Sequence, residues 1–213
     1  MSAARAYAEL RTLPSPLVTT RDAAARLRLS LSAASRLLRH LAGVGLVTRI
    51  RRGLWALTEV SPYAVVPYLT APYPAYVSLW TALYEHGMIA QVPRVIYAAS
   101  LDRSKRVVTA LGTYRIHHLA PRLFGGFDHT PRGPIARAPK ALFDTVYIMG
   151  TYAGRRMGLP EIEIPRGFDR SEIDVWVNRI TSPRRRVFVA RRLDTILKRG
   201  RPGGAASGRR RSG

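Results

Sequence analysis

Apolar residues between positions 18 and 57 recur first at helical spacing and then at the spacing of short strands. From 31 to 41 they return every three or four residues, which predicts an amphipathic helix with one buried stripe. Ser30 precedes this helix as an N-cap, and Gly43 and Gly45 end it. The expected stripe consists of Leu31, Ala34, Leu38 and Leu41.

A second helix and a hairpin flank this element. The preceding helix begins at Thr19, where Asp22 completes a capping box. After the glycines, residues 47–50 and 54–57 read as two strands joined by Arg51-Arg52-Gly53, whose glycine suits a tight hairpin. Two short helices followed by a basic hairpin are typical of a winged helix–turn–helix that binds double-stranded DNA.

We expect the polar face of the second helix to contact DNA. Small residues at its start allow close approach to a groove, and hydroxyl and guanidinium groups then reach base edges or phosphates. Arginines on a hairpin suit contact with the sugar–phosphate backbone. The same motif also serves in protein contacts, and helix-face arginines are often only solvated. The expected DNA-binding residues are Ser32, Ser35, Arg36, Arg39 and His40 on the helix, and Arg49, Arg51 and Arg52 on the hairpin.

The rest of the chain mixes helical and strand patterns without regular alternation, which predicts an α+β fold. A first helix is expected at 1–13. Pro74 and Gly87 bound a further helix that places Trp80 on its inner side. The remaining predicted elements are a short helix at 63–69, strands at 92–99, 106–111, 113–119 and 162–164, and helices at 137–152, 172–180 and 184–198.

Composition divides the chain into four expected parts. A winged helix–turn–helix domain spans 1–58, and a proline-containing connector spans 59–73. A mixed α+β domain follows at 74–198. The tail, 199–213, is rich in arginine and glycine and is expected to be a disordered basic segment.

The charge supports a polyanionic partner. The 213 residues include 35 Lys and Arg against 13 Asp and Glu, a formal net charge of +22, and such an excess attracts nucleic acid. The absence of cysteine excludes disulfides and thiolate metal sites. No apolar run is long enough to cross a bilayer, and the N-terminus lacks a signal-peptide pattern, so we expect a cytoplasmic protein without membrane contact.

Several ordered segments in the second half resemble a known family. They are YVSLWTALY at 76–84, His86-Gly87, Gln91-Val-Pro93, GTYRIH at 112–117, LFGGF at 123–127, Ile135-Ala136, KALFD at 140–144 and Tyr147. Together with the N-terminal motif they cover roughly residues 18–197 and resemble the AbiEi family, the antitoxins of AbiE-type (type IV) toxin–antitoxin systems.

The resemblance implies a function. It implies a winged helix that represses its own operon, usually at inverted repeats, and a C-terminal domain that contributes to antitoxicity. It also implies a nucleotidyltransferase-like toxin as the functional partner, opposed without a stable complex. The arginine-rich tail lies outside the family pattern, and solitary regulators of this family are possible.

The sequence predicts no enzyme and no cofactor. His117 and His118 are neighbours on a predicted strand and point to opposite faces, so they are poorly placed to hold one metal ion. Glu161 and Glu163 share a strand face, but no lysine follows at a nuclease spacing. Phosphate-loop, nucleophile-elbow and dinucleotide motifs are all absent. The pair Lys140–Asp144 is expected to form a modest helical ion pair.

Two alternatives remain open at this stage. In the first, the chain is a general nucleic-acid-binding protein whose affinity comes from Arg184-Arg-Arg186, Arg191-Arg192 and the arginines at 209–211. In the second, it is an antitoxin that binds its partner through the second domain. Deletion of residues 1–58 distinguishes the first alternative, because general affinity would then persist.

Overall fold

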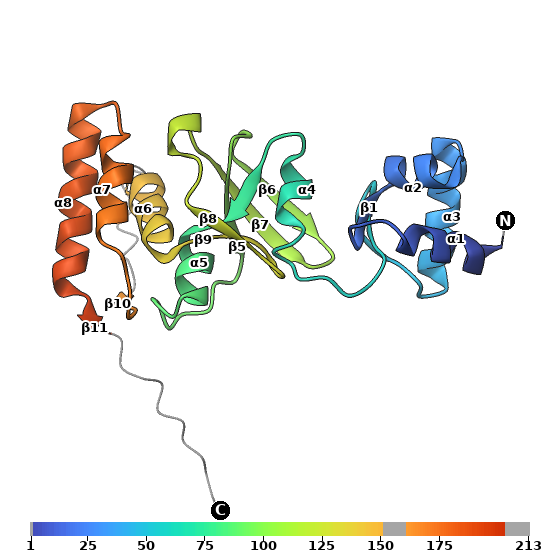
Figure 1. The fold of residues 1–213 in the computed structure, drawn as a ribbon, viewed down its shortest axis with the longest axis horizontal. Coiled ribbons are helices and arrows are strands. Elements are labelled where there is room, and N and C mark those ends of the chain that lie inside the picture. Colours follow the sequence, from blue (N-terminus) through green and yellow to red (C-terminus); the bar gives the residue numbers. More distant parts are fainter. Residues whose placement is uncertain (1, 151–160, 203–213) are drawn as a thin grey trace, which may run out of the picture.

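The chain folds into an elongated molecule with three regions along its long axis (Figure 1). The computed structural model describes residues 2–150 and 161–202. An N-terminal unit, residues 2–58, lies at one end, and a six-stranded sheet occupies the middle. Three helices stack at the other end, α6 (Ala138–Met149), α7 (Ser171–Asn178) and α8 (Pro183–Arg199). The fold is therefore a mixture of α and β structure, as the sequence predicts.

The N-terminal unit contains three helices and a small antiparallel sheet of strand order β1-β3-β2. Its helices begin where capping residues predict them. The capping box is present, since Thr19 Oγ1 accepts the Asp22 N–H at 3.1 Å and the Asp22 carboxylate accepts the Thr19 N–H at 2.8 Å. The elements are α1 (Ala3–Arg11), β1 (Leu17–Thr19), α2 (Thr20–Leu27), α3 (Leu31–Gly43), β2 (Thr48–Arg51) and β3 (Leu54–Ala56).

The small sheet divides its side chains between two cores. Successive residues of a strand point to opposite faces, so Val18 and Trp55 pack with Leu38 in the core of the N-terminal unit. Leu17 and Leu54 instead join the larger core that fills the rest of the molecule. One face of the small sheet therefore packs against the larger core, and this contact attaches the N-terminal unit to the rest of the molecule.

The connector at 59–73 is an ordered part of this junction. It contains the short helix α4 (Val66–Thr70), close to the predicted position, and α4 contacts strand β4 (Ala75–Val77). The Tyr68 hydroxyl lies 2.8 Å from Ser15 Oγ, and the Ala110 N–H donates to the Ile50 carbonyl at 3.1 Å. Polar contacts thus join both units across the buried apolar junction.

The central sheet has the strand order β6-β7-β5-β4-β9-β8. Strand β4 pairs antiparallel with β5 and parallel with β9, and β5 pairs parallel with β7. Both outer pairs, β6–β7 and β8–β9, are antiparallel hairpins. The strands other than β4 are β5 (Ile96–Ser100), β6 (Lys105–Thr109), β7 (Gly112–His118), β8 (Phe127–Thr130) and β9 (Gly133–Ala136).

The helices pack in successive layers on the sheet. Helix α5 (Leu79–Glu85) packs on β5 and on α6, and α6 packs in turn on α7 and α8. Helix α6 is buried almost all round because it lies between these layers. A short 3-10 turn (Pro121–Leu123) leads into β8. No helix in the described ranges is both long and apolar enough to span a membrane.

Four sequence predictions are wrong or incomplete. Residues 75–77 form β4 rather than the start of a helix, and the hairpin β8–β9 was not expected. Leu31 is 55% exposed, because it opens α3 ahead of the core. Order continues past residue 199, since β11 (Arg201–Pro202) pairs with β10 (Glu163–Ile164). The rest of the predicted tail, 203–213, and the predicted helix end at 151–152 lie outside the described residues.

Candidate nucleic-acid interface

Helix α3 is held in place by a cap, a tight turn and a buried stripe. Ser30 Oγ accepts the Ala33 N–H at 3.2 Å and so satisfies one of the free amides at the helix start. Arg28 adopts a left-handed conformation (φ 53°) that ends α2 and reverses the chain within three residues. Ala34, Leu38 and Leu41 are completely buried. The opposite face of α3 therefore has a fixed direction.

That opposite face is open to solvent. Ser32, Arg36, Arg39 and His40 are all exposed, as predicted, and Ser35 is partly buried. The hydrogen bonds found here are local, between Ser32 Oγ and Ser30 Oγ at 3.0 Å and from Arg39 Nε to the Ser35 carbonyl at 3.4 Å. Within the described ranges, no hydrogen bond or ion pair ties these side chains to another element. The predicted contact face is therefore free of the chain's own structure.

The hairpin contributes two exposed arginines. Arg49 lies on β2 with its guanidinium 5.7 Å from the ring of Trp55, which orients the side chain by a cation–π contact. Arg52 is exposed in the turn between β2 and β3. Both side chains are therefore exposed to solvent.

Arg51 departs from the prediction. One guanidinium nitrogen, Nη2, donates to the Tyr68 carbonyl at 3.0 Å, and the side chain is half-buried in the junction with α4. The cause is a bulge in β2, where the pairing shifts between Arg49 and Arg51 and places Arg51 opposite Leu54. This bond and the half-burial hold the Arg51 side chain in the junction with α4 rather than free in solvent. A bulge leaves no mark in the sequence, so the prediction had no means of separating Arg51 from Arg52.

The electrostatics of the N-terminal unit favour an anionic ligand. Its sequence contains two carboxylates, Glu9 and Asp22. Glu9 pairs with Arg26 at 2.9 Å, and Asp22 is engaged in the cap of α2. The arginines of α3 and of the hairpin therefore keep their charge uncompensated by neighbouring acids.

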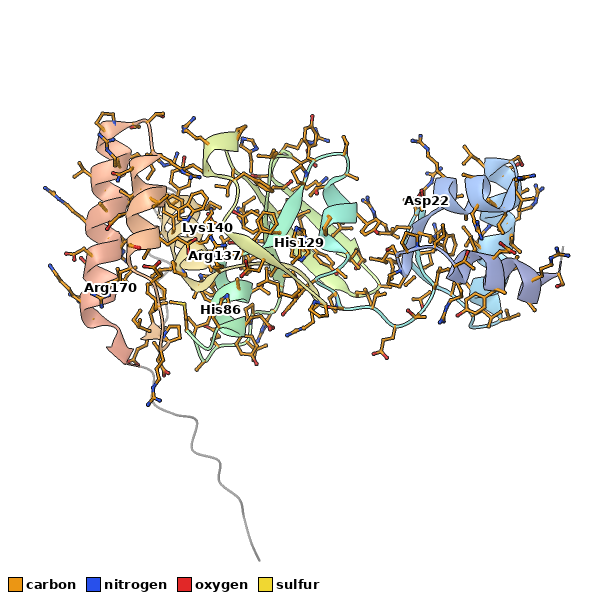
Figure 2. The ribbon with its side chains drawn as sticks, in the orientation of Figure 1. Asp22, His86, His129, Arg137, Lys140 and Arg170 are labelled. Atoms are coloured by element: carbon orange, nitrogen blue, oxygen red, sulfur yellow. The ribbon has the colours of Figure 1, made fainter. Side chains whose placement is uncertain are left out.

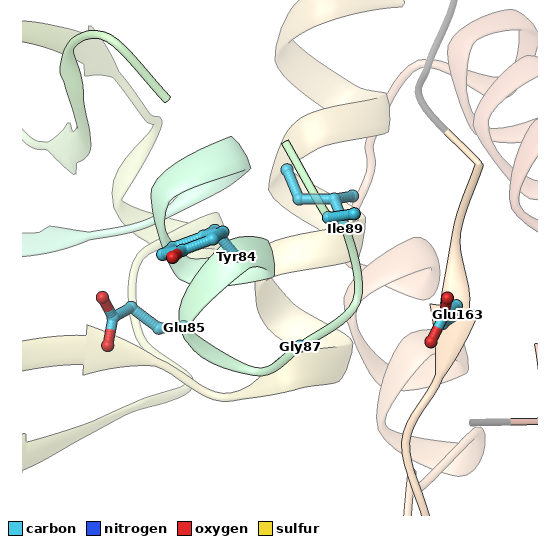
Figure 3. A pocket seen from close by; sticks show the side chains of 6 residues that line it. Tyr84, Glu85, Gly87, Ile89 and Glu163 are labelled. Carbon is cyan, nitrogen blue, oxygen red and sulfur yellow. The ribbon is translucent and has the colours of Figure 1, made fainter. Parts of the chain in front are cut away.

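Two acidic side chains flank a further surface hollow. A surface hollow of about 360 Å³ has Glu85 and Glu163 on opposite sides (Figure 3). Glu85 accepts from the Tyr63 hydroxyl at 2.7 Å and pairs with Arg132, so it is already satisfied. Burial and the adjacent Glu85 raise the pKa of Tyr63 to about 12. Among the described residues no cluster of His, Asp and Glu is placed to hold a metal ion.

The two neighbouring histidines point apart, as predicted. His117 stacks on Tyr97 with 6.1 Å between ring centres, whereas His118 Nδ1 lies 3.2 Å from the Asp102 carbonyl. Burial, assisted by the nearby charge of Arg115, lowers the pKa of His117. Its Nε2 is buried, and no hydrogen-bond partner for it is found among residues 2–150 and 161–202.

The ion pair of Lys140 and Asp144 was predicted from the sequence, but its burial and its hydroxyl partners were not. Lys140 and Asp144 are fully buried rather than exposed, and Asp144 accepts hydrogen bonds from the hydroxyls of Tyr76 and Ser78. Lys140 lies on α6, between the sheet and the outer helices (Figure 2). Because solvent does not reach these groups, we assign them to the core rather than to a reactive site.

Neither a family model nor a curated protein matches the chain.

Proposed function

We propose that this protein is a sequence-specific DNA-binding transcriptional autorepressor whose N-terminal unit is a winged helix–turn–helix. The observation that supports this most directly is the free polar face of α3, which has an apolar stripe beneath it and which no described element covers. A helix of this kind enters the major groove of double-stranded DNA, while the hairpin contacts the adjacent backbone.

Each side chain has a distinct part in this proposal. Arg36 and Arg39 reach guanine edges or phosphates from the middle of α3, since guanidinium groups pair well with both. The small Ser32 and Ser35 permit close approach at its leading end, and His40 follows on the same exposed face. Arg49 and Arg52 contact phosphates from the hairpin. Arg51 is left out because it already binds the Tyr68 carbonyl.

The antitoxin part of the proposal rests on the resemblance to the AbiEi family. In this proposal the chain is non-catalytic, represses at inverted repeats, and counters a nucleotidyltransferase-like toxin without a stable complex. Co-expression with the product of the adjacent reading frame tests it. Rescue of growth without co-purification is the expected result, whereas growth arrest that persists would contradict it.

The DNA-binding experiment uses the full chain and fluorescence anisotropy. The probes are labelled duplexes from the region upstream of its own coding sequence and shuffled duplexes of equal composition. We expect preference for one upstream duplex, and Arg36→Ala or Arg39→Ala should weaken that binding by about 1–3 kcal/mol if the side chain reads a base. Equal affinity for all duplexes, unchanged in both variants, would contradict the proposal.

A second candidate is favoured by α8, where exposed arginines line a hollow beside Val187 and Phe188. Arg184, Arg191 and Arg192 are exposed there, so general attraction of nucleic acid is physically reasonable. Arg185, the middle arginine of the predicted Arg184-Arg-Arg186 group, instead donates to the Tyr147 carbonyl at 3.1 Å. The double variant Arg191→Ala/Arg192→Ala is therefore the matched control. The operator proposal expects it to keep sequence preference, and the alternative expects it to lose most affinity.

A further inference from the structure

A second basic hollow lies on the central sheet, in the middle region of the molecule. It encloses about 470 Å³, the size range of small-ligand sites. Helix α5 contributes Trp80, and the loop before β5 contributes one wall. The residues that line it are Trp80, Gln91, Val92, Pro93, Arg94, Val95, Tyr97, Arg106 and Arg115.

The sheet register brings its polar residues together. Tyr97 of β5 is paired with Arg115 of β7, and Arg115 is paired with Arg106 of β6. Directly paired residues point to the same face, so these three side chains lie in a row across three strands. The neighbouring Lys105 alternates to the other face, where it pairs with Asp102 at 2.5 Å.

The charge of this hollow is unbalanced. Arg94, Arg106 and Arg115 are exposed, and in the described part of the chain none of them makes an ion pair or a side-chain hydrogen bond. The described residues that line the hollow include no carboxylate. Cations gathered without a counter-charge repel one another, and a bound anion removes that cost. Phosphate is an anion that guanidinium groups recognise well, through bidentate charge-assisted hydrogen bonds.

Aromatic rings form the other part of the hollow. The rings of Trp80 and Tyr97 are 6.3 Å apart, and Tyr97 stacks on His117 on its neighbouring strand. Trp80 packs against the core but is only partly buried, and among the described residues its Nε1 has no hydrogen-bond partner. Trp80 is partly exposed beside the arginines, and a nucleobase can stack on such a ring while the arginines neutralise its phosphates.

We propose that this hollow binds a nucleotide, with its base against Trp80 and Tyr97 and its phosphates on Arg106, Arg115 and Arg94. The nucleotide is either free or part of a single strand. The site is separate from the duplex interface on α3 and does not depend on it.

Isothermal titration of the full chain tests the proposal with four probes: ATP, adenosine, tripolyphosphate and a mixed single-stranded octanucleotide. We expect ATP, the octanucleotide or both to bind, with adenosine and tripolyphosphate each weaker because they offer only half of the contacts. Binding of ATP alone identifies a free nucleotide, and binding of the octanucleotide alone identifies a strand. Failure of both to bind would overturn the proposal.

Variants locate the site. Arg115→Gln and Arg106→Gln should each lower affinity by about tenfold or more, since each removes a charge-assisted contact. Trp80→Leu should weaken ATP but leave tripolyphosphate unchanged. The control is Arg122→Gln, an exposed arginine outside the hollow, which should bind as the parent does. Binding that survives in Arg106→Gln and Arg115→Gln but is lost in Arg36→Ala would place the nucleotide on α3 and overturn the proposal. Circular dichroism shows whether each variant is folded. If a sheet variant unfolds, the affinity of Arg94→Gln is measured in its place, because Arg94 lies on the loop before β5.

Discussion

Lys140 and Asp144, one turn apart on α6, form an ion pair that the protein encloses completely. Both side chains are 0% exposed. Asp144 also accepts the Tyr76 hydroxyl at 3.0 Å and the Ser78 hydroxyl at 2.7 Å. The Lys140 ammonium lies 4.5 Å from the centre of the Trp176 ring. Burial lowers the pKa of Lys140 and raises the pKa of Asp144, and each charge opposes the shift of the other. The pair therefore ties β4, α6 and α7 together, and each partner depends on the other.

The first prediction concerns this dependence. Lys140→Met and Asp144→Asn should each reduce the free energy of unfolding by about 3–5 kcal/mol, because each leaves a buried group without its partner. The double variant should cost clearly less than the sum of the two. Urea denaturation of all four proteins measures the coupling.

The same helical spacing on the surface provides the control. Lys198 and Asp194 of α8 are 2.7 Å apart but 73% and 60% exposed. Lys198→Met should therefore change stability by only about 0.5 kcal/mol or less. Additive costs for Lys140→Met and Asp144→Asn would contradict the proposed coupling.

The second prediction concerns two glycines with similar backbones. Gly126 (φ +70°) and Gly87 (φ +65°) are both left-handed. A Cβ at Gly126 would lie 2.7 Å from the Trp176 ring and 2.9 Å from Lys140 Cγ, whereas one at Gly87 would meet nothing within 4 Å. Gly87→Ala should cost about 1–2 kcal/mol from backbone conformation alone, and Gly126→Ala about 1–3 kcal/mol more from overlap. Equal shifts of the urea midpoint in Gly126→Ala and Gly87→Ala would show that the loop at Gly126 moves enough to relieve the overlap, which would contradict the prediction.

Helix starts were predictable because their signals are local. Thr19 and Ser30 cap their helices through their own side chains, and Ser182 accepts the Arg185 N–H at 3.4 Å in the same way. The exposed face of α3 followed from the spacing of its buried stripe. Leu31 was the error in that stripe, since the first residue of a helix need not reach the core.

The sheet was less predictable because its signals are tertiary. Residues 75–77 are buried on both faces between β5 and β9, so they read as a plain apolar run without the alternation of a half-exposed strand. The burial of Lys140 likewise depends on the loop at Gly126 and on Trp176, which are distant in sequence. The spacing of Lys140 and Asp144 predicted the pair, but spacing alone does not show whether water reaches it.

The third prediction separates the two hairpin arginines. Arg52→Ala should flatten the plot of log affinity against log salt for duplex DNA by up to about 0.9, the value for one lost phosphate contact. Arg51→Ala should leave that slope unchanged, because Arg51 is bonded to the Tyr68 carbonyl, and should instead loosen the junction with α4. Anisotropy titrations at several salt concentrations measure both slopes. A flatter slope in Arg51→Ala alone would reverse the assignment.

The fourth prediction concerns His117 and pH. Burial and then the charge of Arg115 lower the pKa of its imidazole below the usual 6.5. As the pH falls through about 6.5, the unfolded chain takes up this proton before the folded protein does, so the folded state loses stability. The loss continues until the pH reaches the lower pKa of the folded state. His117→Gln removes this proton uptake, so its stability relative to the parent should improve as the pH is lowered from 7 to 5. Urea midpoints across this range measure the difference between the two proteins.

Arg115→Gln provides the complementary readout, because loss of its charge should raise the pKa of His117 in an NMR titration while the effect of burial persists. A pH-independent difference between parent and His117→Gln would contradict the shift, and an unmoved titration in Arg115→Gln would assign it to burial alone.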